Sequence, residues 1–495
     1  MGKRIATFFV VLLLIVASFL AFEFARYRTY LGSIRPGITA GGVDLGGVPS
    51  DAALRTLEEM VAAPLSKPLH LRYEEETIVL IPADISFQVQ VERVVEEALW
   101  LSHDQEARPG FLEFVVHGPR RLEAEISLQT EFDANALRSF LMGVAERKDQ
   151  PLREVQPITG TLSFYPGQAE KRLNLDLSIA RIEEALLSID GRGVDLVVEI
   201  KEPAKPTLDL LRGVVEDRTQ EFDGIVGVYI SDPGAQESME INSEISFSGM
   251  SVVKIAIFLE TYLHFAGEEP DLETKEWMDK VVTDPVGSNY WANLLLSLVG
   301  EGSATEGARR TTERMRALGL SQTFILQPYK IEGEEPSSER ARRGLASPSL
   351  NLLVGKKEQY TNPDPIIQTS PHDMGLLLQM IYQCGYGGGA ILDIFPGTIT
   401  PQGCQEIQEA LAQNPVRSMI GAGIPEGTPL AHKHGFAGDT HADAGIVYSP
   451  GGDYVIVQFQ YAPTEWLVWD LSQPVFEDVS RATYNFFNLD QPFLP

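Results

Sequence analysis

A serine and a lysine stand three positions apart at the start of an apolar segment, in FSGMSVVKIAIFLETY (residues 247–262). Residues three apart on a helix share a face, so the Ser251 hydroxyl and the Lys254 amine can touch. A serine hydroxyl is a weak nucleophile until a base takes its proton, and a buried lysine with a lowered pKa can be that base. The pattern indicates nucleophilic catalysis. Taken alone it also fits a plain helix start, and a chain of this length holds about one or two such pairs by chance.

Two later segments hold polar residues that an acylated serine would need for an oxyanion hole, a proton relay and a substrate handle. In TDPVGSNYWANLLLSLVG (residues 283–300), Ser288 and Asn289 lie in a polar loop before an apolar helix, where they could face a cleft. Capping of that helix by either side chain is the simpler interpretation of this segment alone.

The other segment, HKHGFAGDTHADAGIVYSPGGDYVIVQFQY (residues 432–461), predicts two strands joined by a Ser-Pro-Gly-Gly turn. Lys433, His434 and Gly435 start the first strand. A lysine on an edge strand can hold a carboxylate in a cleft, and a glycine beside it lets a substrate approach the backbone. The segment alone also fits a surface strand with a solvated lysine.

The motifs follow one another as Ser-x-x-Lys, then Ser-Asn before Ala-Asn-Leu-Leu, then Lys-x-Gly on a late strand. This order resembles that of the penicillin-recognising serine hydrolases. Residues 208–495 resemble a class A β-lactamase-type domain, also in GIVGVYISDPG, QTSPHDMGLLLQMIY and KHGFAGDTHADAGIVYSP. The resemblance implies an α/β fold, with an antiparallel sheet of N- and C-terminal strands and its helices beside a mainly helical half. The active site would lie between the halves.

The resemblance also implies a role for each motif residue. Ser251 would be the acylated nucleophile, and Lys254 would help to deprotonate it. Asn289 would hydrogen-bond the substrate's side-chain amide and Lys254, while Lys433 would bind the substrate carboxylate. The backbone N–H groups of Ser251 and Phe436 would form the oxyanion hole.

The sequence departs from the family pattern in the second and third motifs. Gly287 stands where the family has the serine that relays a proton to the leaving nitrogen, so that this hydroxyl is either lost or supplied by Ser288 from the next position. His434 stands where a hydroxyl residue is usual, which alters the carboxylate site and adds a group that could titrate near neutral pH.

A third departure concerns deacylation. Class A enzymes activate the hydrolytic water with a glutamate in a Glu-x-x-Leu-Asn pattern. Here Leu350 and Asn351 are present, but Ser347 takes the place of the glutamate, and Glu358 is out of pattern. An acyl-enzyme should therefore persist, and efficient β-lactam hydrolysis is not expected.

Other polar residues could suggest different chemistry. His372, Asp373 and His441 invite a catalytic-triad interpretation, but the first two fit a helix N-terminus and Ser–Lys chemistry needs no histidine. Asp439 and Asp443 could suggest a metal, yet acidic residues at strand turns are usually solvated. We therefore expect neither a metal nor a cofactor.

Composition narrows the class of protein. A chain of 495 residues should form two or three domains. The net charge of −29 argues against nucleic-acid binding and against docking on anionic lipid through a basic patch. Cys384 and Cys404 could form a disulfide outside the cell or remain two buried thiols.

The N-terminus predicts a membrane segment. Lys3 and Arg4 precede residues 5–22, a run without a charge that is just long enough to span a bilayer. The basic residues should stay in the cytoplasm, which would make residues 1–28 a single-pass anchor in a bacterial cell membrane and place the bulk of the chain outside the cytoplasm. A cleaved signal peptide is the alternative, but no clean small-x-small site follows the run.

The middle of the chain, residues 29–207, predicts two loosely similar α+β units. The segments IRPGITAGGVDLGGVPSDAALRTLEE and LNLDLSIARIEEAL resemble the peptidoglycan-binding module of many bacterial surface proteins. Binding of peptidoglycan is implied by this resemblance alone, and a spacer is the alternative. The catalytic domain would occupy residues 208–495.

The sequence thus predicts an anchored extracytoplasmic serine hydrolase that forms an acyl-enzyme on Ser251. Its substrate would be a β-lactam or a peptidoglycan stem peptide. The alternatives are a slow D-Ala-D-Ala peptidase or penicillin-binding protein, and a cell-wall-binding surface protein whose hydrolase fold has lost its activity.

Overall fold

The computed structural model describes residues 2–102, 109–235, 237–331, 353–354, 357–358 and 360–494. The chain divides into two compact units. The first unit contains residues 1–153 and 168–203, and the second contains residues 154–167 and 204–495. The chain therefore enters the second unit, returns to the first, and then enters the second again.

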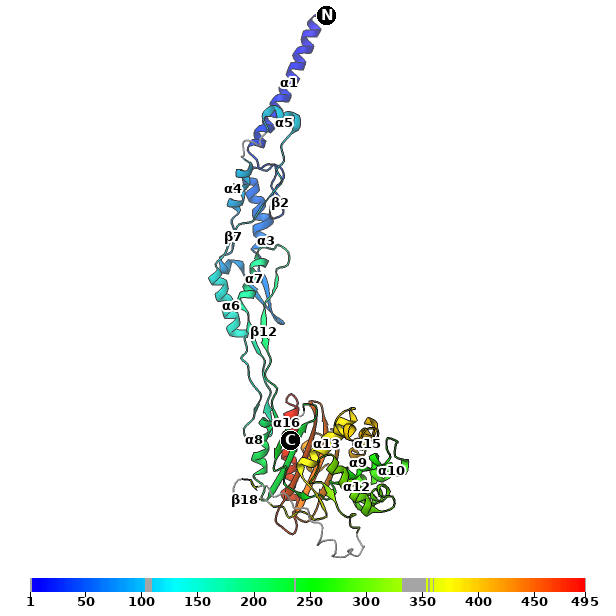
Figure 1. The fold of residues 1–495 in the computed structure, drawn as a ribbon. Helices are drawn as coiled ribbons and strands as arrows, with labels where there is room; N and C mark the ends of the chain where they lie inside the picture. Colours follow the sequence, from blue (N-terminus) through cyan, green and yellow to red (C-terminus); the bar gives the residue numbers. More distant parts are fainter. Residues whose placement is uncertain are drawn as a thin grey trace. The chain divides into compact units, whose positions relative to one another are not determined.

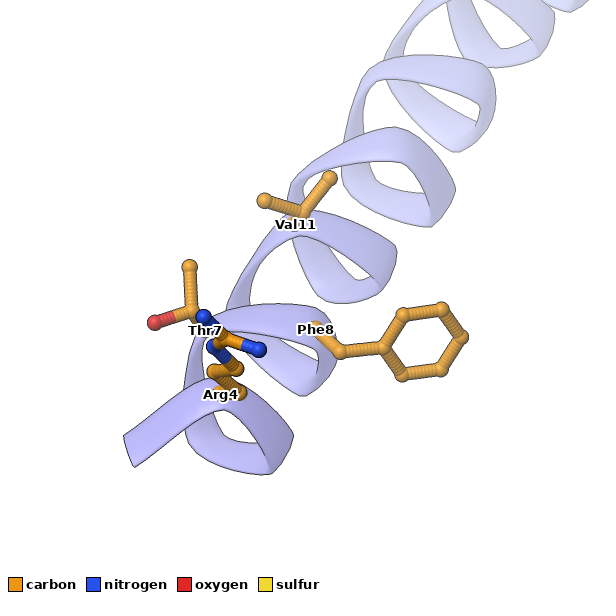
Figure 2. Close-up of a pocket in the computed structure, with 4 residues that line it drawn as sticks. All are labelled: Arg4, Thr7, Phe8 and Val11. Carbon is orange, nitrogen blue, oxygen red and sulfur yellow. The ribbon is translucent and has the colours of Figure 1, made fainter. Parts of the chain in front are cut away.

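Helix α1 (Gly2–Leu31) opens the first unit (Figure 1). Its segment Thr7–Leu31 is long and apolar enough to cross a membrane by length and composition, a test that a signal sequence also passes. A groove on this helix is lined by Arg4, Thr7, Phe8 and Val11 (Figure 2), so it belongs to α1 alone.

The remainder of the first unit is built around one hydrophobic core. Strand β11, from the second half of the unit, pairs in parallel with β3 from the first half, Val194 opposite Leu71. The two predicted α+β units therefore share a sheet and a core. After α1 the elements are β1 (Ile38–Ala40), β2 (Val43–Asp44), α2 (Ser50–Leu57), a π-helical turn (Glu58–Ala62), α3 (Ala63–Leu65), β3 (Leu69–Tyr73), β4 (Glu76–Leu80), a 3-10 turn (Pro82–Ile85), β5 (Gln88–Val89), α4 (Val91–Ser102), α5 (Phe111–His117), β6 (Ala124–Ile126), β7 (Thr130–Glu131), α6 (Ala134–Lys148), β10 (Glu170–Leu173), α7 (Leu175–Leu186), β11 (Gly193–Asp195) and β12 (Val198–Lys201).

The hairpin of β8 (Gln156–Pro157) and β9 (Phe164–Tyr165) belongs to the second unit, although the sequence places it in the middle module. Its Phe164 ring packs edge-on against Phe486, with ring centroids 5.6 Å apart. Asn485 near the end of the last helix donates a hydrogen bond to the Leu162 carbonyl at 2.9 Å. These contacts join segments more than 300 positions apart, which local sequence patterns do not reveal.

A five-stranded antiparallel sheet organises the second unit, in the order β14-β13-β22-β21-β20. Alternation along β22 divides its side chains between two cores. Tyr454 and Ile456 pack with α8 and α16, while Val455 and Val457 pack with the helical half that contains α9, α11 and α13. The predicted β-lactamase-like α/β architecture is confirmed. Its elements are α8 (Leu208–Thr219), β13 (Ile225–Asp232), β14 (Glu237–Ile241), β15 (Phe247–Ser248), α9 (Lys254–His264), α10 (Leu272–Thr283), α11 (Ser288–Val299), α12 (Ala304–Ala317), β16 (Phe324–Ile325), β17 (Leu353–Val354), β18 (Lys357–Glu358), β19 (Ile367–Thr369), α13 (Pro371–Gly385), α14 (Ala390–Ile394), α15 (Pro401–Ala412), a 3-10 turn (Met419–Gly423), β20 (Leu430–Phe436), β21 (Thr440–Ser449), β22 (Gly452–Tyr461) and α16 (Trp469–Phe487).

The C-terminal strands differ in one respect from the prediction. Lys433 is the central residue of β20 and does not start it, and β20 and β21 are separate strands. The chain turns between them because Ala437 N–H donates to the Thr440 carbonyl at 2.7 Å. The lysine therefore lies in the middle of an edge strand.

Cys384 on α13 and Cys404 on α15 form a disulfide whose Cα atoms are 5.8 Å apart. This resolves the alternative that the sequence left open.

Replacing both cysteines by alanine is expected to lower the free energy of unfolding by about 3 kcal/mol. The disulfide restricts the unfolded chain, and its removal gives back the entropy that closing a loop of this length costs. The 20-residue separation sets the size of that loop. Urea unfolding of the second unit measures the effect. A thiol reductant should reproduce the shift in the unmodified protein and leave the double variant unchanged. Equal stability of the two proteins would contradict the prediction.

Candidate active site

Ser251 lies in the turn that leads into α9, one of the most buried helices of the second unit. Met250, just before it, has a φ of +46°, a left-handed backbone conformation that residues other than glycine rarely adopt. The Met250 carbonyl accepts a hydrogen bond from the Tyr329 hydroxyl at 2.9 Å, which holds this turn. Lys254 is the first residue of α9 and is 1% exposed. Its Nζ atom lies 3.0 Å from Ser251 Oγ, so the predicted contact is present.

The start of α11 brings two further predicted residues to the same amine. Lys254 Nζ donates to Ser288 Oγ at 2.9 Å and to Asn289 Oδ1 at 2.7 Å. The Tyr329 ring covers the amine, with its centroid 4.6 Å from Nζ. Three motif residues and one aromatic ring therefore surround a single buried nitrogen.

The hydrogen bonds of these neighbours determine how the amine is oriented. Ser288 donates its own hydroxyl hydrogen to the Val281 carbonyl at 2.7 Å, so its oxygen can only accept from Lys254. Asn289 donates from Nδ2 to the Lys330 carbonyl at 3.0 Å, which leaves Oδ1 as the acceptor. A neutral amine has two hydrogens and one lone pair. Both hydrogens are used by these acceptors, and the lone pair is left for the Ser251 hydroxyl.

Electrostatics favour this neutral form of the amine. Burial, followed by the charge of Lys433, lowers the pKa of Lys254 well below its usual value. Burial also lowers the pKa of Lys433, to about 8, against the opposing effect of Asp443. Two lysines that repel each other in a buried site titrate apart, and Lys433 is the one that keeps its proton at neutral pH.

The end of β20 lies against the nucleophile. A Cβ atom on Gly435 would be 3.0 Å from the Ser251 backbone nitrogen, tighter than ordinary contact. The His432 and His434 carbonyls accept hydrogen bonds from the side chains of Asn414 and Lys433, so both face away from β21. Alternation along an antiparallel pair then turns the N–H of Phe436 to the same open edge. This geometry suits the predicted pair of oxyanion-hole donors.

His434 differs from its prediction. Burial, followed by the charge of Lys433, lowers the pKa of His434 to about 4, so the ring is neutral at pH 7 and does not titrate near neutrality. Its Nδ1 atom lies 3.3 Å from Asn414 Nδ2. The half-buried position beside Lys433 and the amide of Asn414 explains the shift, because a positive ring would gain no acceptor there.

The loop before α11 explains the glycine in the second motif. Asp284 accepts hydrogen bonds from the Gly287 N–H at 2.9 Å and from Trp291 Nε1 at 3.0 Å. A Cβ atom on Gly287 would lie 2.3 Å from Asp284 Oδ2. A serine at 287 would therefore displace the Asp284 carboxylate from its hydrogen bonds, and here Ser288 carries the hydroxyl that reaches the lysine.

The proposed deacylation segment is only partly described. Ser347, Leu350 and Asn351 lie outside the described residues. Glu358 lies in the short strand β18, of which only the backbone is described.

The sequence missed Tyr329 and the residue that holds it. Asn293 on α11 pairs with the Tyr329 backbone in both directions, accepting from its N–H at 2.9 Å and donating to its carbonyl at 2.8 Å. Tyr329 lies 75 positions after Lys254 in an irregular segment. No motif marks it, and only the fold brings its ring over the amine.

The residues of the discounted triad lie in separate environments. Asp373 accepts from the Gln322 N–H at 2.8 Å, while His441 hydrogen-bonds Ser472 at 2.7 Å and stacks on Trp469. The expectation that the strand acids are solvated is wrong for Asp443. It is fully buried, and its Oδ1 atom lies 2.9 Å from His432 Nδ1 beneath β20.

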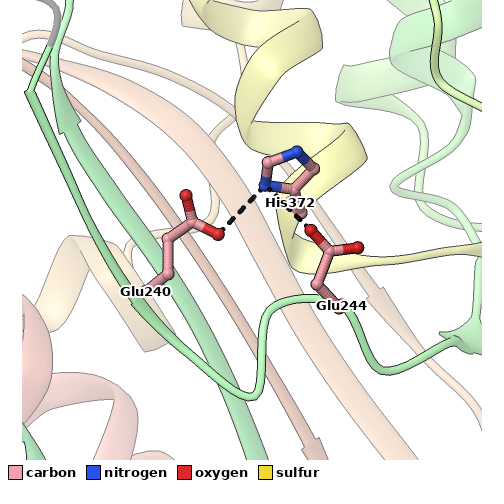
Figure 3. Close-up of side chains that lie close together, drawn as sticks. All are labelled: Glu240, Glu244 and His372. Atoms are coloured by element: carbon pink, nitrogen blue, oxygen red, sulfur yellow. Dashed lines mark hydrogen bonds and ion pairs between the residues drawn. The ribbon is translucent and has the colours of Figure 1, made fainter. Parts of the chain in front are cut away.

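A separate cluster contains the side chains that could hold a metal ion. Figure 3 shows Glu240, Glu244 and His372, whose ligand atoms lie within 4.8 Å of one another. His372 Nδ1 is 3.0 Å from Glu240 and 3.6 Å from Glu244. Hydrogen bonding to Glu240 raises the pKa of His372. The raised pKa favours the protonated form of His372, which can form ion pairs with Glu240 and Glu244.

A buried serine–lysine pair, an edge strand beside the nucleophile and an α/β fold with a helical half define a β-lactamase-type serine hydrolase domain. Residues 288–487 match the model of the beta-lactamase enzyme family. The second unit therefore carries a domain of this family, and the match begins at Ser288, after the Ser-x-x-Lys motif.

Solved structures similar to this chain are also β-lactamases and a penicillin-binding protein. A β-lactamase from Sphaerobacter thermophilus is 18% identical, with 58% of this chain and 100% of that chain covered and a TM-score of 0.42. PBP-A, solved as an acyl-enzyme complex with penicillin G, is 18% identical, with 58% and 99% covered and a TM-score of 0.41. An ancestral class A β-lactamase is 18% identical, with 55% and 98% covered and a TM-score of 0.39. No curated protein matches the chain.

Proposed function

We propose that this protein is a membrane-anchored, extracytoplasmic serine hydrolase that forms an acyl-enzyme on Ser251. Its substrate is a β-lactam or a peptide that resembles the peptidoglycan stem. The observation that carries the proposal is the 3.0 Å contact between Ser251 Oγ and the amine of a fully buried Lys254, whose pKa burial lowers. A neutral amine whose lone pair is directed at a hydroxyl can accept the hydroxyl proton and so activate the serine as a nucleophile.

Acylation follows from this arrangement. Neutral Lys254 takes the proton of the Ser251 hydroxyl while Oγ bonds to the carbonyl carbon of the substrate. The carbonyl oxygen becomes an anion and accepts from the N–H groups of Ser251 and Phe436. When the carbon–nitrogen bond breaks, protonated Lys254 returns its proton to the leaving nitrogen. Ser288 is a positioning residue in this scheme, because its hydrogen stays on the Val281 carbonyl.

Substrate binding uses the strand beside the nucleophile. The Lys433 ammonium holds the substrate carboxylate, and the Gly435 backbone allows the substrate to lie against β20. Asn289 meets the substrate's side-chain amide with the hydrogen of Nδ2 that the Lys330 carbonyl does not use. His434 remains neutral and contributes shape and polarity to the carboxylate site.

In this proposal the N-terminal part of the chain holds the protein at the cell membrane and beside peptidoglycan. Residues 5–22 anchor the chain in the cell membrane, and the first unit contacts peptidoglycan. The anchor is supported by the length and composition of α1. Contact with peptidoglycan is supported by the residue pattern of residues 29–207 alone.

Incubation with fluorescent penicillin and with a chromogenic cephalosporin tests the chemistry, with intact-mass spectrometry on the same samples. We expect a stable adduct on Ser251 that Ser251→Ala does not form, and little turnover. That result would match a penicillin-binding protein or a slow D-Ala-D-Ala peptidase. Rapid turnover that the variant loses would instead identify a working β-lactamase. The absence of both adduct and turnover would favour a cell-wall-binding protein that has lost catalysis.

A further inference from the structure

The C-terminal part of α1 packs on a second, short helix of the same unit. The Phe24 and Phe111 rings meet edge-on at 5.6 Å, and the Tyr30 and Phe114 rings stack at 5.2 Å. Tyr27 contacts both phenylalanines of α5 and donates its hydroxyl to the Pro109 carbonyl at 3.1 Å. These contacts make the last turns of α1 part of the folded first unit, and they place α5 beside α1 (Figure 1).

The position of α5 along α1 coincides with the expected membrane surface. A hydrocarbon core of about 30 Å needs about 20 helical residues. Counted from Ile5, where the uncharged run begins, such a span ends near Phe24. The first charged residues after the run, Glu23 and Arg26, form an ion pair at this level. Phe111, which touches Phe24, therefore lies where the acyl chains meet the lipid headgroups.

The part of α5 that does not contact α1 carries two exposed apolar side chains, beside Glu113, which pairs with Arg120, and the exposed His117. Leu112 is 76% exposed and Val116 is 73% exposed. They stand four positions apart, so they lie on one face of α5. Phe114 between them is buried against α1. Two large aliphatic side chains that are exposed side by side on so short a helix are typical of a surface that contacts another apolar surface.

We propose that α5 rests in the outer surface of the bilayer, with Leu112 next to the lipid acyl chains and Val116 at the level of the headgroups, beside the end of α1. The exposed side chains of α5 continue the apolar surface of α1, so the lipid that surrounds α1 is the partner that they contact. Aromatic rings favour this depth of a membrane, and the rings of α1 and α5 gather there. The helix is held by apolar contact and not by charge, which agrees with a chain of net charge −29. The inference rests on the proposed anchoring of α1.

Site-specific fluorescence in vesicles tests the inference with the full-length chain. The two native cysteines are bonded to each other, so an introduced cysteine is the one free thiol for labelling. We would place an environment-sensitive fluorophore at Leu112→Cys and Val116→Cys. Leu13→Cys on α1 reports the anchor, and Leu177→Cys on α7, 54% exposed, is the matched control on an apolar surface residue. The proteins are reconstituted in phosphatidylcholine vesicles with and without a spin-labelled lipid.

The expected result is blue-shifted emission that the spin-labelled lipid quenches at 13, 112 and 116 but not at 177. Quenching at 13 together with unquenched, water-like emission at 112 and 116 would overturn the docking of α5 and leave the anchor intact. The absence of quenching at 13 would overturn the anchor itself, and the docking of α5 with it.

Discussion

Replacing Lys254 by arginine or by methionine lowers the rate of Ser251 acylation by about 10²- to 10⁴-fold, the usual contribution of a general base. Arginine keeps the positive charge but does not lose its proton in a protein. Methionine keeps the apolar stem and removes the nitrogen. Both variants therefore remove the lone pair that the acceptors Ser288 and Asn289 direct at the nucleophile. Stopped-flow labelling with fluorescent penicillin measures the rate.

The control for this experiment is Lys280→Met on the neighbouring helix α10, which removes a lysine without touching the nucleophile. Circular dichroism and thermal unfolding show whether each variant is folded. An acylation rate within about tenfold of the unmodified protein in both Lys254 variants would mean that another group is the base.

Acylation should follow a bell-shaped pH profile, with its alkaline limb near pH 8. The limb arises because burial lowers the pKa of Lys433 to about 8. Below that pH the ammonium holds the substrate carboxylate, and above it the neutral amine does not. The acid limb reports Lys254, which must lose its proton to act. Measurement of kcat/KM, or of the second-order acylation rate, across pH 5–10 reports these groups in the free protein.

The Lys433→Ala variant tests whether the alkaline limb of this pH profile arises from Lys433. The alkaline limb should disappear, and the rate near pH 7 should fall by about 10- to 100-fold, since a hydrogen bond to a charged group contributes about 1.5–3 kcal/mol. The acid limb should move to higher pH, because the charge of Lys433 is one of the two causes that lower the pKa of Lys254. Lys330→Ala, an exposed lysine whose carbonyl alone contacts Asn289, is the matched control. A variant profile that keeps its alkaline limb would contradict the assignment to Lys433.

The sequence predicts the parts of the site that depend on short-range geometry. The contact between Ser251 and Lys254 follows from a three-residue spacing. The hydrogen bond between Asn289 and Lys254 is what the family resemblance implies, whereas the contact between Ser288 and Lys254 is not predicted. The sheet of early and late strands is predicted by the resemblance to a fold with that arrangement.

What the sequence could not predict depends on contacts between distant segments. The ring of Tyr329 lies over Lys254 only because α11 holds its backbone through Asn293. Asp443 is buried on β21 and contacts His432 of the neighbouring strand β20. The lowered pKa of His434 reflects burial and a nearby lysine, neither of which is visible in the order of residues.

The chain passes between the two units three times, near residues 153, 167 and 203. A protease that cuts one of these crossings would leave the units covalently joined, so release of the second unit from the first would need three cuts. The segment of residues 154–167, which belongs to the second unit, is made long before the residues on which it packs. Its hairpin packs against Asn485 and Phe486, which are made more than 300 positions later. The second unit can therefore reach its final packing only after helix α16 has been made.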